Sequence, residues 1–186
     1  LRILDLGILS SYSYDDNDTH YEKGGEVWDA TSTTFTGRGL TARILDHQRY
    51  DKVGRVIVFR FTSDGGSASG TTVLVVKGSS DAFDFYTDAG LWSMICCIQM
   101  LTFFVPLLNQ LPNQIFAGIL WALPTPGIFT NIDAIYHNFS KQYPEDAFLI
   151  TGHSLGGGVA TAAGGRLGIH AISFSGPGSH FSRLRF

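Results

Sequence analysis

The sequence is short of charge and lacks a cluster of basic residues. Only 16% of its 186 residues are charged, and the formal net charge is −3. A protein that binds nucleic acid needs a basic stripe to neutralise phosphates, so we expect no nucleic-acid partner. With 44% hydrophobic residues, the chain is long enough for one domain with its own core and too short for two comfortable ones.

Cysteine is also scarce, which bears on disulfides and metal sites. Cys96 and Cys97 are neighbours in an apolar run, and neighbouring cysteines very rarely bridge each other. They lack CxxC spacing and a nearby histidine cluster, so we expect no metal site. Buried thiols are the favoured interpretation, and acylation at a membrane face is the alternative.

Long uninterrupted hydrophobic runs are absent, although residues 91–123 form a very apolar stretch. Polar residues and prolines, such as Gln99, Pro106 and Asn109, interrupt this stretch. It therefore falls short of the roughly 20 apolar residues that a spanning helix needs. We expect an apolar insert that acts as a lid or contacts a membrane or lipid surface, with ordinary core helices as the alternative.

The order of the remaining segments predicts an α/β fold. β-Branched runs at 55–61 and 72–76 flank a turn-rich stretch and predict a hairpin, in which 73–76 is apolar enough to be buried on both faces. The other expected elements are helices over 1–13, over 132–139 and after Ser154, and strands over 147–151 and 171–174. Alternating strands and helices indicate a mostly parallel sheet flanked by helices, in one domain over 1–186.

The pentapeptide Gly152-His153-Ser154-Leu155-Gly156 carries the sharpest chemical signal. A serine hydroxyl that attacks a carbonyl must be lifted out of the sheet, and a tight turn between a strand and a helix achieves this. Such a turn crowds the backbone, so glycine is needed two residues to either side of the serine. A buried strand leads into the motif and a helix of small residues leaves it, which favours a nucleophile over an incidental serine.

Three segments resemble the fungal-type (class 3) lipases of the α/β-hydrolase fold. In chain order they lie at 75–88, which includes Lys77-Gly78-Ser79, at 141–157, which includes the pentapeptide, and at 174–178, which includes Gly176-Pro177. The resemblance covers roughly residues 55 to 180. This sequence departs from the family pattern by Lys77 for the usual Arg, Phe85 for the usual Trp, and a longer, more apolar insert after Asp88.

The resemblance implies a role for each residue of the motifs. Ser154 would attack the acyl carbonyl, and the backbone N–H of Leu155 would hold the oxyanion. Ser79 would supply a second oxyanion donor through its N–H and hydroxyl, with a plain turn residue as the alternative. His153 would belong to the elbow and point away from the nucleophile. Asp88 would be structural, and the chemistry would need no cofactor.

A serine nucleophile also needs an acid and a histidine, which in this fold follow it in that order. No Asp or Glu follows Ser154, and neither His170 nor His180 stands where the family places its base. We therefore expect an α/β-hydrolase domain that is truncated at its C-terminus and inactive by itself. The start at Leu1 rather than Met agrees with a fragment and leaves the compartment open, a membrane-associated or secretory, lysosome-like one included.

The function implied for the parent enzyme is hydrolysis of carboxylic esters of lipids, such as triacylglycerol, through an acyl-enzyme. Two alternatives stay open. One is another acyl hydrolase on the same scaffold, such as a phospholipase or thioesterase. The other is a lipase-like module that has lost its triad and binds lipid or protein.

Overall fold

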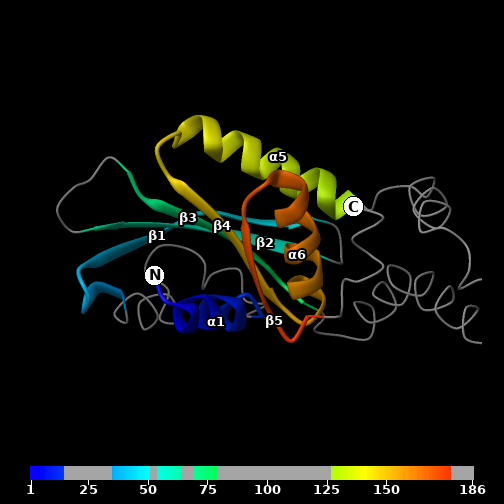
Figure 1. Ribbon diagram of the computed structural model, residues 1–186, viewed down its shortest axis with the longest axis horizontal. Coiled ribbons are helices and arrows are strands. Elements are labelled where there is room, and N and C mark those ends of the chain that lie inside the picture. Colours follow the sequence, from blue (N-terminus) through cyan, green and yellow to red (C-terminus); the bar gives the residue numbers. More distant parts are fainter. Residues whose placement is uncertain (15–34, 51–53, 64–68, 79–126, 177–186) are drawn as a thin grey trace, which may run out of the picture.

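Five strands form one sheet, and their order in space is their order along the chain (Figure 1). The structure is a computed structural model that describes residues 1–14, 35–50, 54–63, 69–78 and 127–176. Its elements are α1 (Ile3–Tyr12), β1 (Leu40–Tyr50), β2 (Gly54–Ser63), β3 (Thr71–Val76), α5 (Gly127–Gln142), β4 (Ala147–His153), α6 (Leu155–Leu167) and β5 (His170–Phe174).

The sheet changes from antiparallel to parallel pairing at β3. Strand β2 runs antiparallel to β1 and β3, so the hairpin predicted from the sequence is confirmed. Strand β4 runs parallel to both β3 and β5. Parallel neighbours need a crossover connection, and helix α5 precedes β4 while α6 joins β4 to β5. The predicted α/β class with flanking helices is confirmed, in a sheet that is mixed.

Strand β1 is the one described strand that the sequence analysis does not predict. It forms an edge of the described sheet and pairs with β2 over its whole length. An edge strand has one side open to solvent and tolerates charged side chains, and β1 carries Arg43 and Asp46. These charged residues interrupt the alternation of apolar and polar residues by which a half-buried strand is recognised in a sequence. The apolar range 91–123 and Asp88 lie outside the described residues.

Helices cover both faces of the sheet, and each face has its own hydrophobic core. Helices α5 and α6 pack on the face of Val56, Val58, Leu74 and Val76, and α1 packs on the face of Ile57, Phe59, Val73 and Val75. Residues 73–76 are therefore fully buried, as their sequence predicts. Because side chains alternate between the two faces of a strand, both faces of β2 and β3 need apolar residues.

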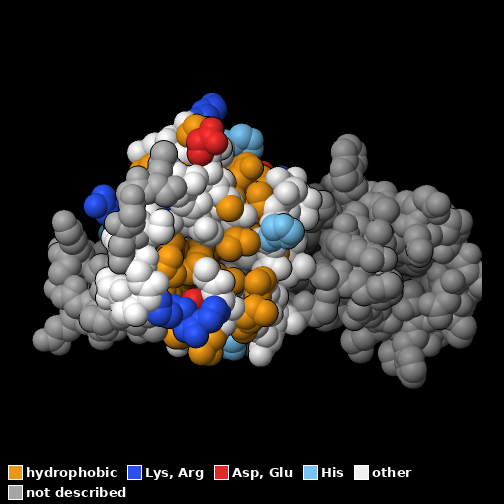
Figure 2. Space-filling model, turned by 60° about the vertical axis from the view of Figure 1, so that its left-hand side comes forward, with side chains coloured by type: hydrophobic (Ala, Val, Ile, Leu, Met, Phe, Trp, Pro, Cys, Tyr) orange, Lys and Arg blue, Asp and Glu red, His pale blue; other side chains and the backbone are white. Residues whose placement is uncertain are grey.

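Most large hydrophobic side chains of the described part are covered. Those that stay exposed lie at the start of α1, where Ile3 and Leu4 are each 67% exposed. Figure 2 shows hydrophobic side chains reaching one face of the molecule between scattered charged ones. No helix within the described ranges is long and apolar enough to cross a membrane.

Asp146, just before β4, joins three segments at the end of the sheet opposite to Ser154. Its carboxylate accepts hydrogen bonds from Arg60 Nε (2.7 Å), Arg60 Nη2 (2.9 Å), Thr72 Oγ1 (2.8 Å) and the Gly70 N–H (2.7 Å). Burial alone would raise the pKa of Asp146, but these hydrogen bonds and the charge of Arg60 outweigh burial and lower the pKa below its usual 3.8. The stability that this carboxylate contributes is therefore present above about pH 4 and is lost as the pH falls through the lowered pKa.

Replacing Asp146 by alanine should lower the free energy of unfolding by about 3 kcal/mol, measured by urea denaturation of the full-length protein at pH 7. The variant leaves the Arg60 guanidinium, which is 18% exposed, without its carboxylate. Asp133→Ala is the matched control, because the Asp133–Arg166 pair is more exposed and should contribute less than about 1 kcal/mol. Equal losses in the two variants would contradict a special role for Asp146.

Candidate active site

Ser154 lies in the tight turn between β4 and α6. Its backbone has φ 55° and ψ −128°, a conformation that residues other than glycine rarely adopt. The Ser154 carbonyl accepts the N–H of Gly157 (3.0 Å) and the N–H of Gly158 (3.2 Å), so the serine caps the start of α6. This is the strand-to-helix turn that the pentapeptide predicts, and a strained serine in such a turn is typical of a functional position.

The two glycines of the pentapeptide are needed because backbones meet on either side of the serine. A Cβ atom on Gly152 would lie 2.5 Å from the backbone of Gly156 and 2.7 Å from the Val76 carbonyl oxygen. A Cβ atom on Gly156 would overlap the same Val76 oxygen and lie 2.7 Å from the Lys77 carbonyl. The first turn of α6 therefore packs directly on the end of β3.

Leu155 is the first residue of α6, and its side chain is buried. The first N–H groups of a helix have no carbonyl partner within the helix, and the helix dipole favours negative charge there. The N–H of Leu155 therefore belongs to an end of the helix that suits an oxyanion. Ser79, the second donor implied by the resemblance, lies outside the described residues, although Gly78 directly before it is described and buried.

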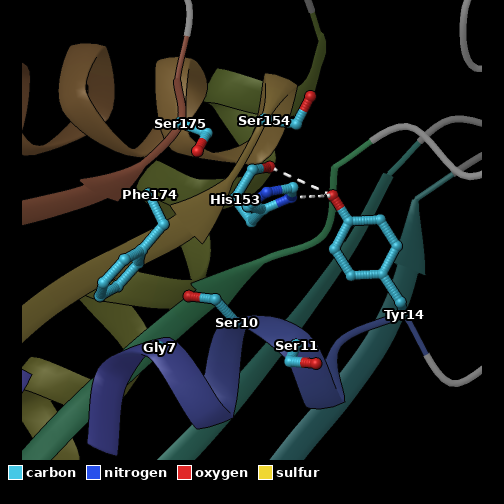
Figure 3. Close-up of a pocket in the computed structure, with 8 residues that line it drawn as sticks. All are labelled: Gly7, Ser10, Ser11, Tyr14, His153, Ser154, Phe174 and Ser175. Atoms are coloured by element: carbon cyan, nitrogen blue, oxygen red, sulfur yellow. Dashed lines mark hydrogen bonds between the residues drawn. The ribbon is translucent and has the colours of Figure 1, made fainter. Parts of the chain in front are cut away.

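His153 faces α1 and not Ser154 (Figure 3). Its Nδ1 lies 2.9 Å from the hydroxyl oxygen of Tyr14, which also donates to the His153 carbonyl oxygen at 3.4 Å. The Ser154 side chain points away from this pair (Figure 3). Tyr14 could not be found from the sequence, because it precedes His153 by 139 residues and belongs to no motif.

The end of β5 supports the turn from the other side. The N–H of Ser154 donates to the Phe174 carbonyl at 2.9 Å. Ser175, the next residue, also has a positive φ of 51°, and sequence reasoning missed it. A cavity of about 630 Å³ opens here, at the carboxyl ends of β4 and β5 beside α1 (Figure 3). Its lining consists of Gly7, Ser10, Ser11, Tyr14, His153, Ser154, Phe174 and Ser175.

No histidine of the described ranges is hydrogen-bonded to the Ser154 hydroxyl. His170 pairs with Leu149, whereas Phe174 pairs with His153, so His170 lies at the opposite end of β5 from Ser154. His170 and Phe174 are four residue steps apart along β5, a distance of roughly 13 Å in a strand. His180 lies outside the described residues. The residues that the structure describes also contain no group of three His, Cys, Asp or Glu side chains that could hold a metal ion.

Several curated fungal proteins with the name "Putative lipase ATG15" are similar to this chain. The Saccharomyces cerevisiae protein is 46% identical over 44 residues, which are 24% of this chain and 8% of the relative. The Mycosarcoma maydis protein is 35% identical over 54 residues, 29% of this chain and 10% of the relative. The Cryptococcus neoformans protein is 26% identical over 144 residues, 75% of this chain and 26% of the relative. These matches thus span about a quarter or less of each relative's length.

The family comparison covers the elements that build the turn. The model of the family described as lipase (class 3) matches residues 73–172, more than half of the chain. The matched range begins in β3, contains the whole pentapeptide and ends within β5. This agrees with the resemblance seen in the sequence motifs. The chain therefore belongs to the class 3 lipase family.

Proposed function

We propose that the full-length protein is a serine hydrolase that cleaves carboxylic esters of lipids, acylglycerols above all, with Ser154 as the nucleophile. The observation that carries this proposal is the strained backbone of Ser154, φ 55°, at the start of α6 and beside a cavity. The family and the names of the relatives support a lipase as the class of hydrolase.

The chemistry follows from the position of the serine. Ser154 Oγ attacks the acyl carbonyl while its proton passes to a histidine, and a tetrahedral intermediate forms. The intermediate expels the alcohol, which takes the proton from the histidine, and leaves an acyl-enzyme; water then hydrolyses the acyl-enzyme to the carboxylic acid and free Ser154. The N–H of Leu155 and the N–H and hydroxyl of Ser79 stabilise the oxyanion. Losing one such donor typically costs on the order of 3 kcal/mol of transition-state stabilisation. The reaction needs side chains and backbone donors, and no cofactor is part of the proposal.

Among the described residues no general base lies beside Ser154. No carboxylate follows Ser154 in the sequence, and His170 lies at the far end of β5. We propose that residues 1–186 alone turn over a short-chain nitrophenyl ester only at a residual rate, because an unassisted hydroxyl is a poor nucleophile. Efficient turnover that disappears on mutating His170 or His180 would overturn this proposal.

A substrate panel on the full-length protein tests the proposed function. Triacylglycerol emulsions, phospholipid vesicles and acyl thioesters would be compared by kcat/KM. The proposal expects hydrolysis of acylglycerols to exceed that of the other two classes. Preference for phospholipid or thioester would identify a different acyl hydrolase on the same scaffold, and no turnover of any ester would favour a binding module.

We also propose that residues 91–123 contact the lipid surface, because aromatic and aliphatic side chains are dense there. The double change Phe103→Ser and Phe104→Ser should weaken partition of the full-length protein into zwitterionic or anionic vesicles by roughly a hundredfold or more, since each such side chain that leaves water contributes about 1.5 to 3 kcal/mol and about 1.4 kcal/mol is a factor of ten. Sedimentation with sucrose-loaded vesicles measures the partition. Equal binding of both proteins, or no binding by either, would contradict this proposal.

A further inference from the structure

Three elements that are far apart in sequence meet at the Tyr14 hydroxyl. Tyr14 lies two residues after the end of α1, Gly78 two residues after β3, and His153 is the last residue of β4. The hydroxyl oxygen is 2.9 Å from His153 Nδ1 and 3.4 Å from the His153 carbonyl oxygen. The two rings meet edge to face, with centroids 5.7 Å apart. His153 therefore touches Tyr14 through its imidazole and its backbone (Figure 3).

The Tyr14 hydroxyl has one proton to donate, and the protonation of His153 Nδ1 decides whether Nδ1 or the His153 carbonyl oxygen accepts it. If Nδ1 carries a proton, Nδ1–H donates to the tyrosine oxygen and the tyrosine O–H can donate to the His153 carbonyl. If Nδ1 is unprotonated, it accepts the tyrosine O–H instead. In either tautomer the hydroxyl links the tyrosine to the residue directly before Ser154. A phenylalanine in place of Tyr14 would keep the ring contact and lose this link.

Gly78 places the same hydroxyl against the strand that leads to Ser79. A Cβ atom on Gly78 would overlap both the Tyr14 hydroxyl and the His153 carbonyl oxygen. The three residues are thus in close contact, and the Tyr14 hydroxyl occupies the space that a side chain at position 78 would need. The Tyr14 hydroxyl therefore lies between Gly78 and His153, just beyond the last paired residues of β3 and β4, Val76 and Gly152.

Helix α1 is anchored well enough to hold Tyr14 in place. Ser10 Oγ lies 3.3 Å from Thr151 Oγ1 of β4, and the threonine hydroxyl donates to the Ile172 carbonyl of β5 at 2.8 Å. At the other end of the helix, the buried Asp5 forms a two-bond ion pair with Arg38, with distances of 3.1 and 2.9 Å. The hydroxyl of Tyr14 therefore projects from a helix that is fixed to the central strands.

We propose that Tyr14 is a positioning residue: its hydroxyl holds His153, and through it the backbone of Ser154, in place against Gly78. The inference rests on the proposed function of Ser154. Tyr14 acts through His153 and not on the acyl group. An error of about 1 Å in the placement of reacting groups can reduce a rate by about a hundredfold, so a modest shift of the turn has a measurable cost.

Replacing Tyr14 by phenylalanine in the full-length protein tests the proposal. We expect kcat for a soluble ester, and the rate constant of fluorophosphonate labelling, to fall about tenfold while KM changes less than about twofold. The fraction of protein labelled at completion should stay equal to that of the wild type. Tyr136→Phe is the matched control, because this half-buried tyrosine lies on α5 against Phe148 and should leave the rate unchanged.

Variants of His153 separate positioning from simple stability. His153→Leu removes the imidazole partner of the hydroxyl and leaves only the backbone carbonyl, so it should reproduce most of the loss of rate, whereas His153→Asn offers a polar atom near the position of Nδ1 and should restore most of it. The double variant Tyr14→Phe/His153→Leu should be no slower than Tyr14→Phe, because Tyr14→Phe already removes both hydrogen bonds of the hydroxyl to residue 153. If Tyr14→Phe does not fold, the comparison of His153→Leu with His153→Asn decides.

Three results would overturn the proposal. They are labelling of Tyr14→Phe at the wild-type rate, equal rates for His153→Leu and His153→Asn, and a smaller labelled fraction with an unchanged rate constant. The last result would show that Tyr14 only stabilises the fold. Failure of the proposed function looks different, because a Ser154→Ala variant would then still be labelled.

Discussion

Replacing Ser154 by alanine should abolish fluorophosphonate labelling of the full-length protein and lower kcat for ester hydrolysis by about 10⁵- to 10⁶-fold. The attacking oxygen is lost, and only oxyanion stabilisation and substrate binding remain, which give a residual acceleration of about 10³ to 10⁴ over water. Alanine has the same Cβ as serine, so the strain at φ 55° does not change. The melting temperature should therefore stay close to that of the wild type, as measured by calorimetry.

The control for this experiment is a serine away from the turn. Ser140→Ala removes a hydroxyl that donates to the His137 carbonyl on α5, and it should be labelled like the wild type. Mass spectrometry of the labelled wild-type protein should find the phosphonate on the peptide that contains Ser154. Undiminished labelling of Ser154→Ala, or a label on another serine, would end the assignment.

Gly156→Ala should disrupt the same turn without removing the nucleophile. The added methyl group would overlap the Val76 carbonyl oxygen and approach the Lys77 carbonyl, and backbone atoms in a sheet cannot move aside easily. We expect the free energy of unfolding to fall by about 1 to 3 kcal/mol, as for other overpacked sites. The labelling rate should fall at least about tenfold, because α6 is pushed away from β3 and the N–H of Leu155 moves with it.

Gly165→Ala is the matched control in the same helix. Apart from its chain neighbours and the nearby backbone of α6, no atom of the described residues lies within 4 Å of the position of its added Cβ, so the methyl group has open space there. Alanine favours a helix interior over glycine by about 0.5 to 1 kcal/mol, so this variant should unfold at a higher urea concentration and keep the wild-type labelling rate. The explanation by steric overlap fails if both variants shift stability in the same direction.

The elements that could be predicted are those whose own residues carry the signal. Strands β3 and β5 are short apolar runs, and they are found within one residue of their predicted bounds. Helix α5 was recognised from apolar residues at helical spacing, and α6 from small residues after Ser154. Strand β1 was missed because its charged residues are tolerated only by its place at an edge, and an edge is a property of the assembled sheet.

The α/β class, the two-sided burial of β3 and the turn around Ser154 all follow from patterns along the chain. The spacing of Gly152 and Gly156 around Ser154 is a local signal, although part of the crowding that requires these glycines comes from Val76 and Lys77 at the end of β3. The side chains that surround this turn depend instead on how the folded elements pack together. Tyr14 meets His153 across 139 residues, and Ser154 donates its N–H to Phe174 because β5 lies beside β4. Contacts of this kind follow from strand order and helix placement, which no local pattern of residues contains.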